Sequence, residues 1–254
     1  MADGSDERIT DPRPGRGVSP SHPDDGEPDR RDHQAWWDIP LTIAIAIGVV
    51  LLITTFVVKP FSIPSGSMED TLGIGDRVLV NRTVYHLRDI ERGDIVVFDG
   101  ADSFVPAGAA PQRNPVSGAL TWIGQSIGLV PPDSTDFIKR VIGVGGDRVT
   151  CCDAAGRITV NGVPLAEQDY LYPGDAPSTQ DFDVVVPQGM LWVMGDHRSN
   201  SADSRAHQGD PGGGFVPAAK VVGRAMTVLW PLSRIQALPI PETFATVPPS
   251  GQGS

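Results

Sequence analysis

The chain has 254 residues, of which 40% are hydrophobic, and a formal net charge of −11. This length allows one or two domains with a hydrophobic core, and an acidic chain without a basic stripe argues against nucleic acid as a partner. Gly (29 residues) and Pro (24 residues) are abundant, and residues typical of helical bundles are sparse. The composition therefore favours a body rich in β-strands.

The N-terminal segment, residues 1–35, is predicted to be a disordered tail. Its sequence is rich in Pro, Asp and Arg and contains almost no large apolar side chains. Such a segment cannot bury enough apolar surface to offset the entropy that it would lose on ordering.

The next segment, residues 36–59, is predicted to be a transmembrane anchor. Residues 39–58 form a run of twenty residues without a charge, the length that a helix needs to cross a hydrocarbon core of ~30 Å. Trp36 and Trp37 stand at its near edge, where indole rings favour the headgroup region. The run exceeds the about 7–15 apolar residues of a cleaved signal peptide, so an uncleaved anchor is expected.

The basic residues that flank the anchor predict its orientation. Arg30 and Arg31 precede the apolar run and Lys59 follows it, and the flank with more Lys and Arg stays in the cytoplasm. We therefore expect a single-pass protein of the plasma membrane, with a cytoplasmic tail and an extracytoplasmic body over residues 60–237.

The body reads as all-β. Seven short runs rich in β-branched residues are bounded by Gly, Asp and Pro, at residues 76–82, 94–98, 136–144, 157–162, 183–187, 190–195 and 220–230. Such runs predict strands. Asn161-Gly162, between two of the apolar runs, predicts a two-residue hairpin turn.

Two further segments interrupt or end the β pattern. Residues 99–136 are an insertion rich in Ala, Gly and Pro, in which apolar residues from Leu120 to Val130 recur at helical spacing. This spacing predicts a short amphipathic helix, either at the membrane interface or packed on the β body. The Pro-rich segment 238–254 is expected to be a loose tail.

The two cysteines, Cys151 and Cys152, are adjacent, which excludes a long-range disulfide within the chain. Neighbouring Cα atoms lie about 3.8 Å apart, less than the usual separation across a disulfide. We expect two free thiols, with a strained bridge between neighbours as the alternative.

A Ser and a Lys are the first candidates for chemistry. Ser65 and Ser67 lie in a small, turn-forming tripeptide a few residues beyond the apolar run; such a turn suits an oxyanion site, although most Ser-Gly pairs are ordinary loops. In the predicted strand 136–144, alternation places Lys139 on one face with apolar neighbours. Burial there would lower the pKa of the amine and let it accept a proton from serine, whereas a lysine at a sheet edge would reach solvent.

The segment 195–205, GDHRSNSADSR, is a polar cluster after a predicted strand. It is either a solvated turn or a source of a hydroxyl that orients an amine, with Asp203 and Arg205 paired to stiffen it. The five histidines show no metal-ligand spacing, so neither a metal site nor a cofactor is expected. His197 and His207 are interpreted as surface histidines.

Five motifs follow the anchor in order: SGSM, GDRVLVNR, RGDIVVF, FIKRVIGVGGDRV and GDHRSNSADSR. Over residues 61–230 this order resembles type I signal peptidases, the bacterial leader peptidase family, and in particular an actinobacterial-like member. The resemblance implies two antiparallel β-sheet domains, with a cap subdomain around residues 147–190. It also implies that Ser67 is the nucleophile and Lys139 the general base of a Ser/Lys dyad, and that the Ser65 hydroxyl joins the Ser67 N–H in the oxyanion hole.

The same resemblance assigns supporting roles within segment 195–205. Ser201 would orient the lysine amine, and Asp203 with Arg205 would hold the site together. The chain departs from the family pattern at three places. Asp70 stands where many members have Pro, His197 where they have Asn, and Gly145 where a Pro is frequent before Gly-Asp. These departures put the rigidity of the turns in question and remove neither dyad member.

Together these observations predict a membrane-anchored serine endopeptidase that removes signal peptides from exported preproteins, cutting after small-x-small. Its expected partners are those signal peptides, the phospholipid bilayer and the secretion translocon. Two alternatives remain: a non-catalytic anchored β module that binds envelope proteins, which would not need Ser67 or Lys139, and a repressor-type Ser/Lys autoprotease, which would need a soluble DNA-binding domain.

Overall fold

The computed structural model describes residues 31–105, 135–210 and 212–250. The helix predicted between Leu120 and Val130 lies outside the described residues, as does nearly all of the predicted N-terminal tail. The chain divides into two compact units, residues 1–46 and 47–254.

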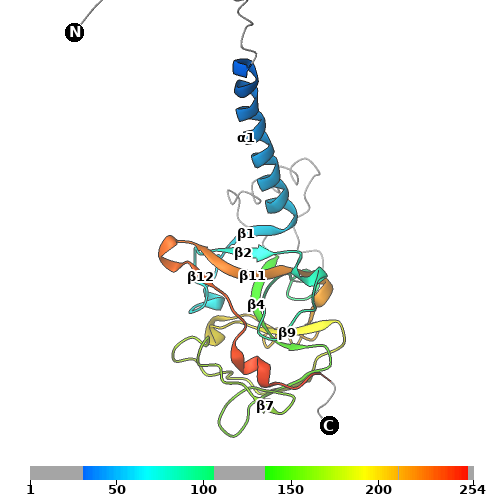
Figure 1. The fold of residues 1–254 in the computed structure, drawn as a ribbon. Coiled ribbons are helices and arrows are strands. Elements are labelled where there is room, and N and C mark those ends of the chain that lie inside the picture. Colours follow the sequence, from blue (N-terminus) through cyan, green and yellow to red (C-terminus); the bar gives the residue numbers. More distant parts are fainter. Residues whose placement is uncertain (1–30, 106–134, 211, 251–254) are drawn as a thin grey trace, which may run out of the picture. The chain divides into compact units, whose positions relative to one another are not determined.

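Helix α1 runs from Arg31 to Phe56 and contains Pro40, so it covers most of the segment predicted as an anchor (Figure 1). Within the described part of the chain, no helix combines the length and the apolar character needed to cross a membrane. The transmembrane anchor over residues 36–59 stays a prediction.

The body contains two antiparallel sheets. The large sheet has eight strands in the order β1-β2-β11-β3-β4-β9-β10, with β12 paired to β11. Its strands are β1 (Val58–Ser62), β2 (Arg77–Asn81), β3 (Ile95–Asp99), β4 (Asp136–Val144), β9 (Met190–Met194), β10 (Val216–Pro217), β11 (Val221–Trp230) and β12 (Gln236–Ala237). Each of the predicted runs that falls in this sheet forms a strand, and the mostly β character of the body is confirmed.

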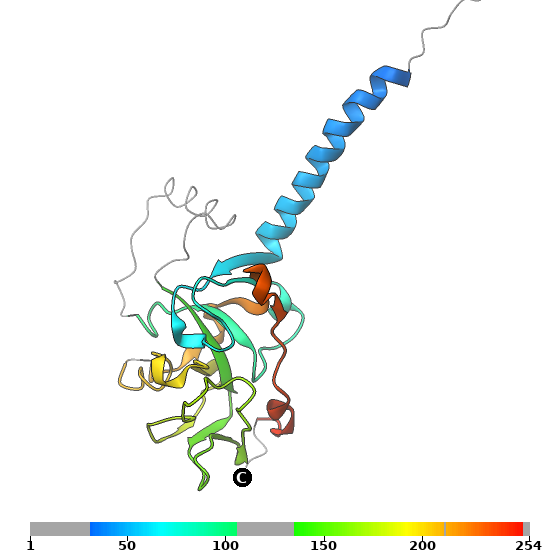
Figure 2. The same cartoon turned by 90° about the vertical axis from the view of Figure 1, so that its left-hand side faces the viewer.

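The small sheet has four strands in the order β7-β6-β5-β8. These are β5 (Arg148–Cys151), β6 (Thr159–Val160), β7 (Val163–Pro164) and β8 (Phe182–Val185), and they lie within the segment predicted as a cap. Asn161 and Gly162 join β6 to β7 with φ of 52° and 80°, the left-handed conformation that a tight hairpin turn requires, so the hairpin prediction is confirmed. Figures 1 and 2 both show this sheet at the end of the body away from β1 and β2.

The apolar core follows from strand alternation. In β3, Ile95 and Val97 pack in a cluster on one face of the large sheet, whereas Val96 and Phe98 pack in a second cluster on the other face. A third cluster joins the small sheet to the far end of β4 and β9, with Trp192 fully buried in it. Three apolar clusters therefore fix β4 from both faces and from its end.

The C-terminal segment differs from the loose tail that the composition predicted. Residues Glu242–Thr246 form a short 3₁₀ helix, η6, and Leu238, Phe244 and Val247 are buried. Phe244 belongs to the cluster under the small sheet, whereas Leu238 belongs to a cluster of the large sheet. The proline content suggested irregular backbone, which is what the segment has, but its spaced apolar side chains hold that backbone on the body.

The cysteines also differ from expectation, because Cys151 and Cys152 form a disulfide. The expectation of two free thiols rested on the ~3.8 Å Cα spacing of a trans peptide bond. The bond between these residues is cis, and their Cα atoms lie 3.0 Å apart.

Burial of Phe244 yields a prediction for stability. Phe244→Ala should lower the free energy of unfolding by about 3 kcal/mol, because it removes a buried ring from the cluster and leaves a cavity. Equilibrium urea unfolding of the full chain in detergent measures this change. Val185→Ala is the control, since Val185 is 62% exposed and should change stability by no more than about 0.5 kcal/mol. Equal effects of the two substitutions would show that the segment is not packed in solution.

Candidate active site

Three of the predicted segments meet at one place on the large sheet. They are the turn that contains Ser67, the strand that contains Lys139, and the polar segment 195–205. The first is the 3₁₀ turn η1 (Gly66–Met68), whose three residues are all buried. Met68 is fully buried in the apolar cluster beside β2, and the N–H of Leu72 donates to its carbonyl at 2.7 Å. The turn is thus anchored by an apolar side chain on one side and presents Ser67 on the other.

Lys139 lies in β4, between β3 and β9, and its amine reaches Ser67. The Nζ atom donates to Ser67 Oγ at 2.6 Å and to the main-chain carbonyl of Ile138 at 3.0 Å. Lys139 is 3% exposed and Ser67 is 6% exposed. The structure therefore brings the two predicted dyad residues into direct contact, away from bulk water.

Burial changes the protonation of the amine. It lowers the pKa of Lys139 to about 8, while the negative charges of Asp203 and Asp196 oppose this shift. Because the charged form is the one that loses hydration on burial, a buried lysine titrates below its ordinary value. A substantial fraction of the amine is thus neutral at mildly alkaline pH and is able to accept a proton.

Asp203 and Arg205 form the ion pair that the sequence suggested. Arg205 donates from Nε and Nη2 to the carboxylate of Asp203 at 2.9 and 2.8 Å, and Arg205 Nη2 also donates to the carbonyl of Arg198 at 2.8 Å. Burial by itself would raise the pKa of Asp203, but Arg205 and the N–H of Gly195 lower it below its usual value. The loop that follows β9 is held by this charged carboxylate.

The other two predicted residues lie at the site with fewer contacts. Ser65 precedes η1 in extended conformation, is exposed, and does not cap the turn with its hydroxyl. Ser201 Oγ lies against Gly195, since a Cβ on Gly195 would come within 2.3 Å both of this atom and of the Ser67 carbonyl. Among the described residues, Ser201 makes no hydrogen bond to Lys139.

Comparison with known proteins identifies the family. Residues 36–230 match the family described as signal peptidase, peptidase S26. The chain belongs to this family. It is therefore an endopeptidase of the serine type, and the resemblance inferred from the five motifs is confirmed.

Individual relatives agree with this assignment. The chain is 40% identical over 239 residues to a probable signal peptidase I of Mycobacterium leprae (strain TN), covering 82% of this chain and 80% of that protein. It is 39% identical over 233 residues to signal peptidase I of Mycobacterium tuberculosis (strain ATCC 25618 / H37Rv), covering 83% and 77%. A probable signal peptidase I-2 of Synechocystis sp. (strain ATCC 27184 / PCC 6803 / Kazusa) is 36% identical over 203 residues, covering 80% and 77%. The mycobacterial relatives confirm the actinobacterial character.

This signal peptidase also holds a buried ion pair that the sequence analysis missed. Arg140, next to Lys139 but on the opposite face of β4, donates from Nε and Nη2 to Asp196 at 2.8 and 2.7 Å. Thr71 Oγ1 donates to the same carboxylate at 2.6 Å, and the guanidinium lies 4.3 Å from the Tyr170 ring centroid. The signal was a second basic residue within a mostly apolar strand, because a buried Arg needs an anion as its partner.

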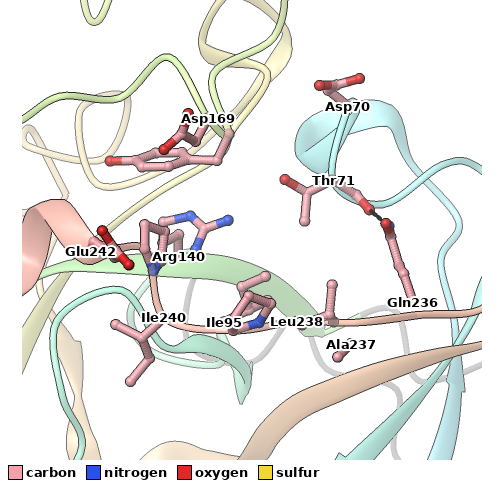
Figure 3. A pocket seen from close by; sticks show the side chains of 13 residues that line it. Asp70, Thr71, Ile95, Arg140, Asp169, Gln236, Ala237, Leu238, Ile240 and Glu242 are labelled. Atoms are coloured by element: carbon pink, nitrogen blue, oxygen red, sulfur yellow. Dashed lines mark hydrogen bonds between the residues drawn. The ribbon is translucent and has the colours of Figure 1, made fainter.

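A cavity of about 530 Å³ lies beside Asp70 and Thr71, which follow η1. Figure 3 shows Thr71 and Gln236 on one side of it, with Arg140, Asp169 and Glu242 on the other. Neither dyad residue is among those that line it, so this cavity lies apart from the Ser67–Lys139 contact. Within the described residues, no group of three or more His, Cys, Asp or Glu side chains is arranged to hold a metal ion.

The two histidines interpreted as surface residues are both partly buried. The His197 side chain is 15% exposed and lies 3.1 Å from Glu69. The His207 side chain is 17% exposed and stacks on Phe104 with ring centroids 4.2 Å apart. Sequence reasoning did not place either ring, because Glu69 and Phe104, which they contact, come from segments distant along the chain.

The lowered pKa of Lys139 predicts a pH-dependent stability. The folded chain titrates this lysine at about pH 8, against an ordinary value of 10.5, so between these values the unfolded chain binds more protons and the free energy of unfolding rises with pH. The destabilisation is fully present below the folded value. Lys139→Met should therefore flatten this rise and add about 2–3 kcal/mol of stability at neutral pH.

Urea unfolding of the full chain at several pH values from about 7 to 10.5 measures this effect. Lys220→Met is the matched control, because the Lys220 side chain is 29% exposed and lies outside the site. It should keep the wild-type pH slope. Parallel stability curves for wild type and Lys139→Met would show that the lysine is not desolvated in the folded chain.

Proposed function

We propose that this signal peptidase removes signal peptides from exported preproteins by means of a Ser67–Lys139 dyad. Ser67 Oγ attacks the scissile carbonyl carbon while the neutral Lys139 amine accepts the hydroxyl proton. The amine then donates this proton to the leaving amino group, and it activates the water that releases the acyl group from Ser67. The 2.6 Å contact between two buried side chains carries this proposal.

The developing oxyanion needs hydrogen-bond donors that are fixed before the reaction. We assign this role to the main-chain N–H of Ser67 and to the hydroxyl of Ser65. Ser65 is exposed at the start of η1, which supports a role in meeting a substrate. In the same proposal Ser201 orients the lysine amine, and the Asp203–Arg205 pair keeps the loop after β9 against η1.

The substrate binds as an extended strand in this proposal. β1 stands at one end of the order of the large sheet and finishes at Ser62, three residues before Ser65. An extended peptide is able to add to such an edge through main-chain hydrogen bonds, with alternate side chains in pockets. We assign small side chains to the first and third positions before the cut, which is the small-x-small pattern.

The proposal places the enzyme in the plasma membrane with a cytoplasmic N-terminus. The uncharged run of residues 39–58 and the flanking Arg residues support this arrangement. The body adds an exposed apolar patch, formed by Ile74, Trp230, Leu232 and Ile235, which are 52–69% exposed. Trp230 pairs with Arg77 in the sheet, and Arg234 donates to Asp76 at 3.2 Å, so the two segments adjoin.

Such a patch favours the phospholipid bilayer as a partner, because indole and aliphatic side chains partition into the headgroup region. The secretion translocon is the further partner in this proposal, since exported preproteins emerge from it. Attachment to one membrane raises the effective concentration of enzyme near these substrates.

The catalytic proposal is tested by substitution in the full chain with a model preprotein as substrate. Ser67→Ala, Lys139→Met and Lys139→Arg should each abolish cleavage, because they remove the nucleophile or a neutral base. Ser233→Ala, at an exposed serine, should cleave like wild type. For wild type, kcat/KM should rise with pH through about 8 as Lys139 loses its proton. Cleavage by Ser67→Ala or Lys139→Arg at near wild-type rates would overturn the dyad.

The topology is tested with an epitope at the N-terminus of the chain. Protease added outside intact spheroplasts should digest the body and leave the epitope on a short membrane-bound fragment, because the tail is on the cytoplasmic side. Permeabilised spheroplasts are the control and should lose both. Loss of the epitope before permeabilisation would reverse the orientation.

A further inference from the structure

One of the departures from the family pattern, His197 in the loop after β9, lies against the turn that carries Ser67. In the folded chain His197 Nδ1 lies 3.1 Å from Oε2 of Glu69 and 3.2 Å from the main-chain carbonyl oxygen of Gly66. A residue of the distant loop therefore contacts the turn that carries Ser67.

The chemistry of these contacts settles where the histidine proton lies. A carboxylate and a carbonyl oxygen both accept hydrogen bonds, so Nδ1 must be the donor to both. The ring is held in this orientation by Tyr172, whose ring stacks on it at 3.8 Å with an interplanar angle of 13°. Glu69 thus selects the Nδ1–H form of His197, as an acceptor beside a histidine commonly does.

The carbonyl of Gly66 belongs to the same peptide unit as the N–H of Ser67. Because a peptide unit is planar, a donor that fixes the C=O also fixes the direction of the N–H at its other end. The N–H of Glu69 donates to the same carbonyl at 3.1 Å, and the N–H of His197 donates to the carbonyl of Ser67 at 3.2 Å. His197 therefore holds the peptide units on both sides of Ser67.

The position of Glu69 is fixed as well. A Cβ on Gly66 would lie 2.7 Å from Glu69 Oε2 and 3.0 Å from Asn200 Nδ2. The carboxylate is thus packed against the Cα of Gly66, and the Glu69 side chain is 33% exposed. A hydrogen bond to a C=O also polarises the N–H of the same peptide unit and makes it a stronger donor.

We infer that His197, oriented by Glu69, is a positioning residue that aims and strengthens the Ser67 N–H as an oxyanion donor. The inference rests on the proposed function, in which that N–H stabilises the oxyanion. In this inference His197 and Glu69 contribute to stabilising the transition state, in addition to the proton transfer carried out by Ser67 and Lys139. Substrate binding in the ground state does not depend on it.

Two substitutions of His197 distinguish the effect of its hydrogen-bond donor from the effect of its aromatic ring. His197→Phe keeps an aromatic ring against Tyr172 and loses Nδ1–H. His197→Asn loses the ring but keeps a side-chain N–H at the distance from Cα where Nδ1 stands. We expect kcat to fall roughly tenfold in His197→Phe, less than the about 10²- to 10³-fold cost of losing an oxyanion donor, for which Ser65→Ala is the comparison. His197→Asn should recover most of this loss.

The pattern of the kinetic constants is part of the test. Loss of an interaction made only in the transition state lowers kcat and kcat/KM by the same factor, so KM should stay within about twofold of wild type. His207→Phe is the matched control, because it removes a stacked histidine that bonds to Asp210, and it should leave kcat unchanged. Thermal unfolding of each variant checks the fold.

Substitutions of Glu69 provide a second, independent test. Glu69→Gln keeps an oxygen that accepts from Nδ1–H and should retain activity, whereas Glu69→Met removes the acceptor and should lower kcat. In the unsubstituted protein, ¹⁵N NMR of histidine at a pH where the ring is neutral should show His197 protonated at Nδ1. This measurement does not depend on whether any variant folds.

Each outcome decides a different claim. Activity of Ser67→Ala overturns the proposed function and the inference with it. Inactive Ser67→Ala together with wild-type kcat in His197→Phe overturns the inference alone. A raised KM with unchanged kcat, equal losses in His197→Phe and His197→Asn, or an Nε2–H tautomer for His197 would each overturn it too.

Discussion

The desolvation of one amine is the constraint on which the rest of the structure depends. Lys139 is useful as a base only if it is kept from water, and β4 achieves this by running between β3 and β9 with apolar clusters on both faces. Burial is costly for the charged form. In the proposed mechanism the lowered pKa has a use that offsets this cost, because it lets the Lys139 amine take the proton of Ser67.

The neighbouring Arg140 also loses hydration on burial, but it stays charged because it is paired with a carboxylate. It is also buried, which by itself would lower its pKa, but Asp196 raises that pKa and keeps the guanidinium charged. Asp196 in turn accepts a hydrogen bond from Thr71, in the segment that follows η1. The two adjacent basic residues on opposite faces of one strand thus differ in their partners. Lys139 contacts a hydroxyl and a carbonyl, whereas Arg140 is paired with a carboxylate.

The sequence predicted what is local and left open what depends on distant partners. The strand alternation of residues 136–144 placed Lys139 on an apolar face, and the motifs placed Ser67 beyond the apolar run. The contact of His197 with Glu69 and the pairing of Arg140 with Asp196 were not predicted, because each joins segments far apart in the chain. The packing of Phe244 was missed for a similar reason. The proline content of its segment predicts an irregular backbone, but it does not show which apolar surface that segment packs against.

The strand order of the large sheet has a consequence for when the Ser67–Lys139 contact is able to form. β1 and β2 lie on the Ser67 side, β3, β4 and β9 lie on the Lys139 side, and β11 is the strand that joins β2 to β3. The ribosome makes β11, residues 221–230, long after both dyad residues. Before this strand is made, nothing in the large sheet joins the β1-β2 pair to the strands from β3 to β10. The contact between Ser67 and Lys139 therefore depends on one of the last strands of the chain.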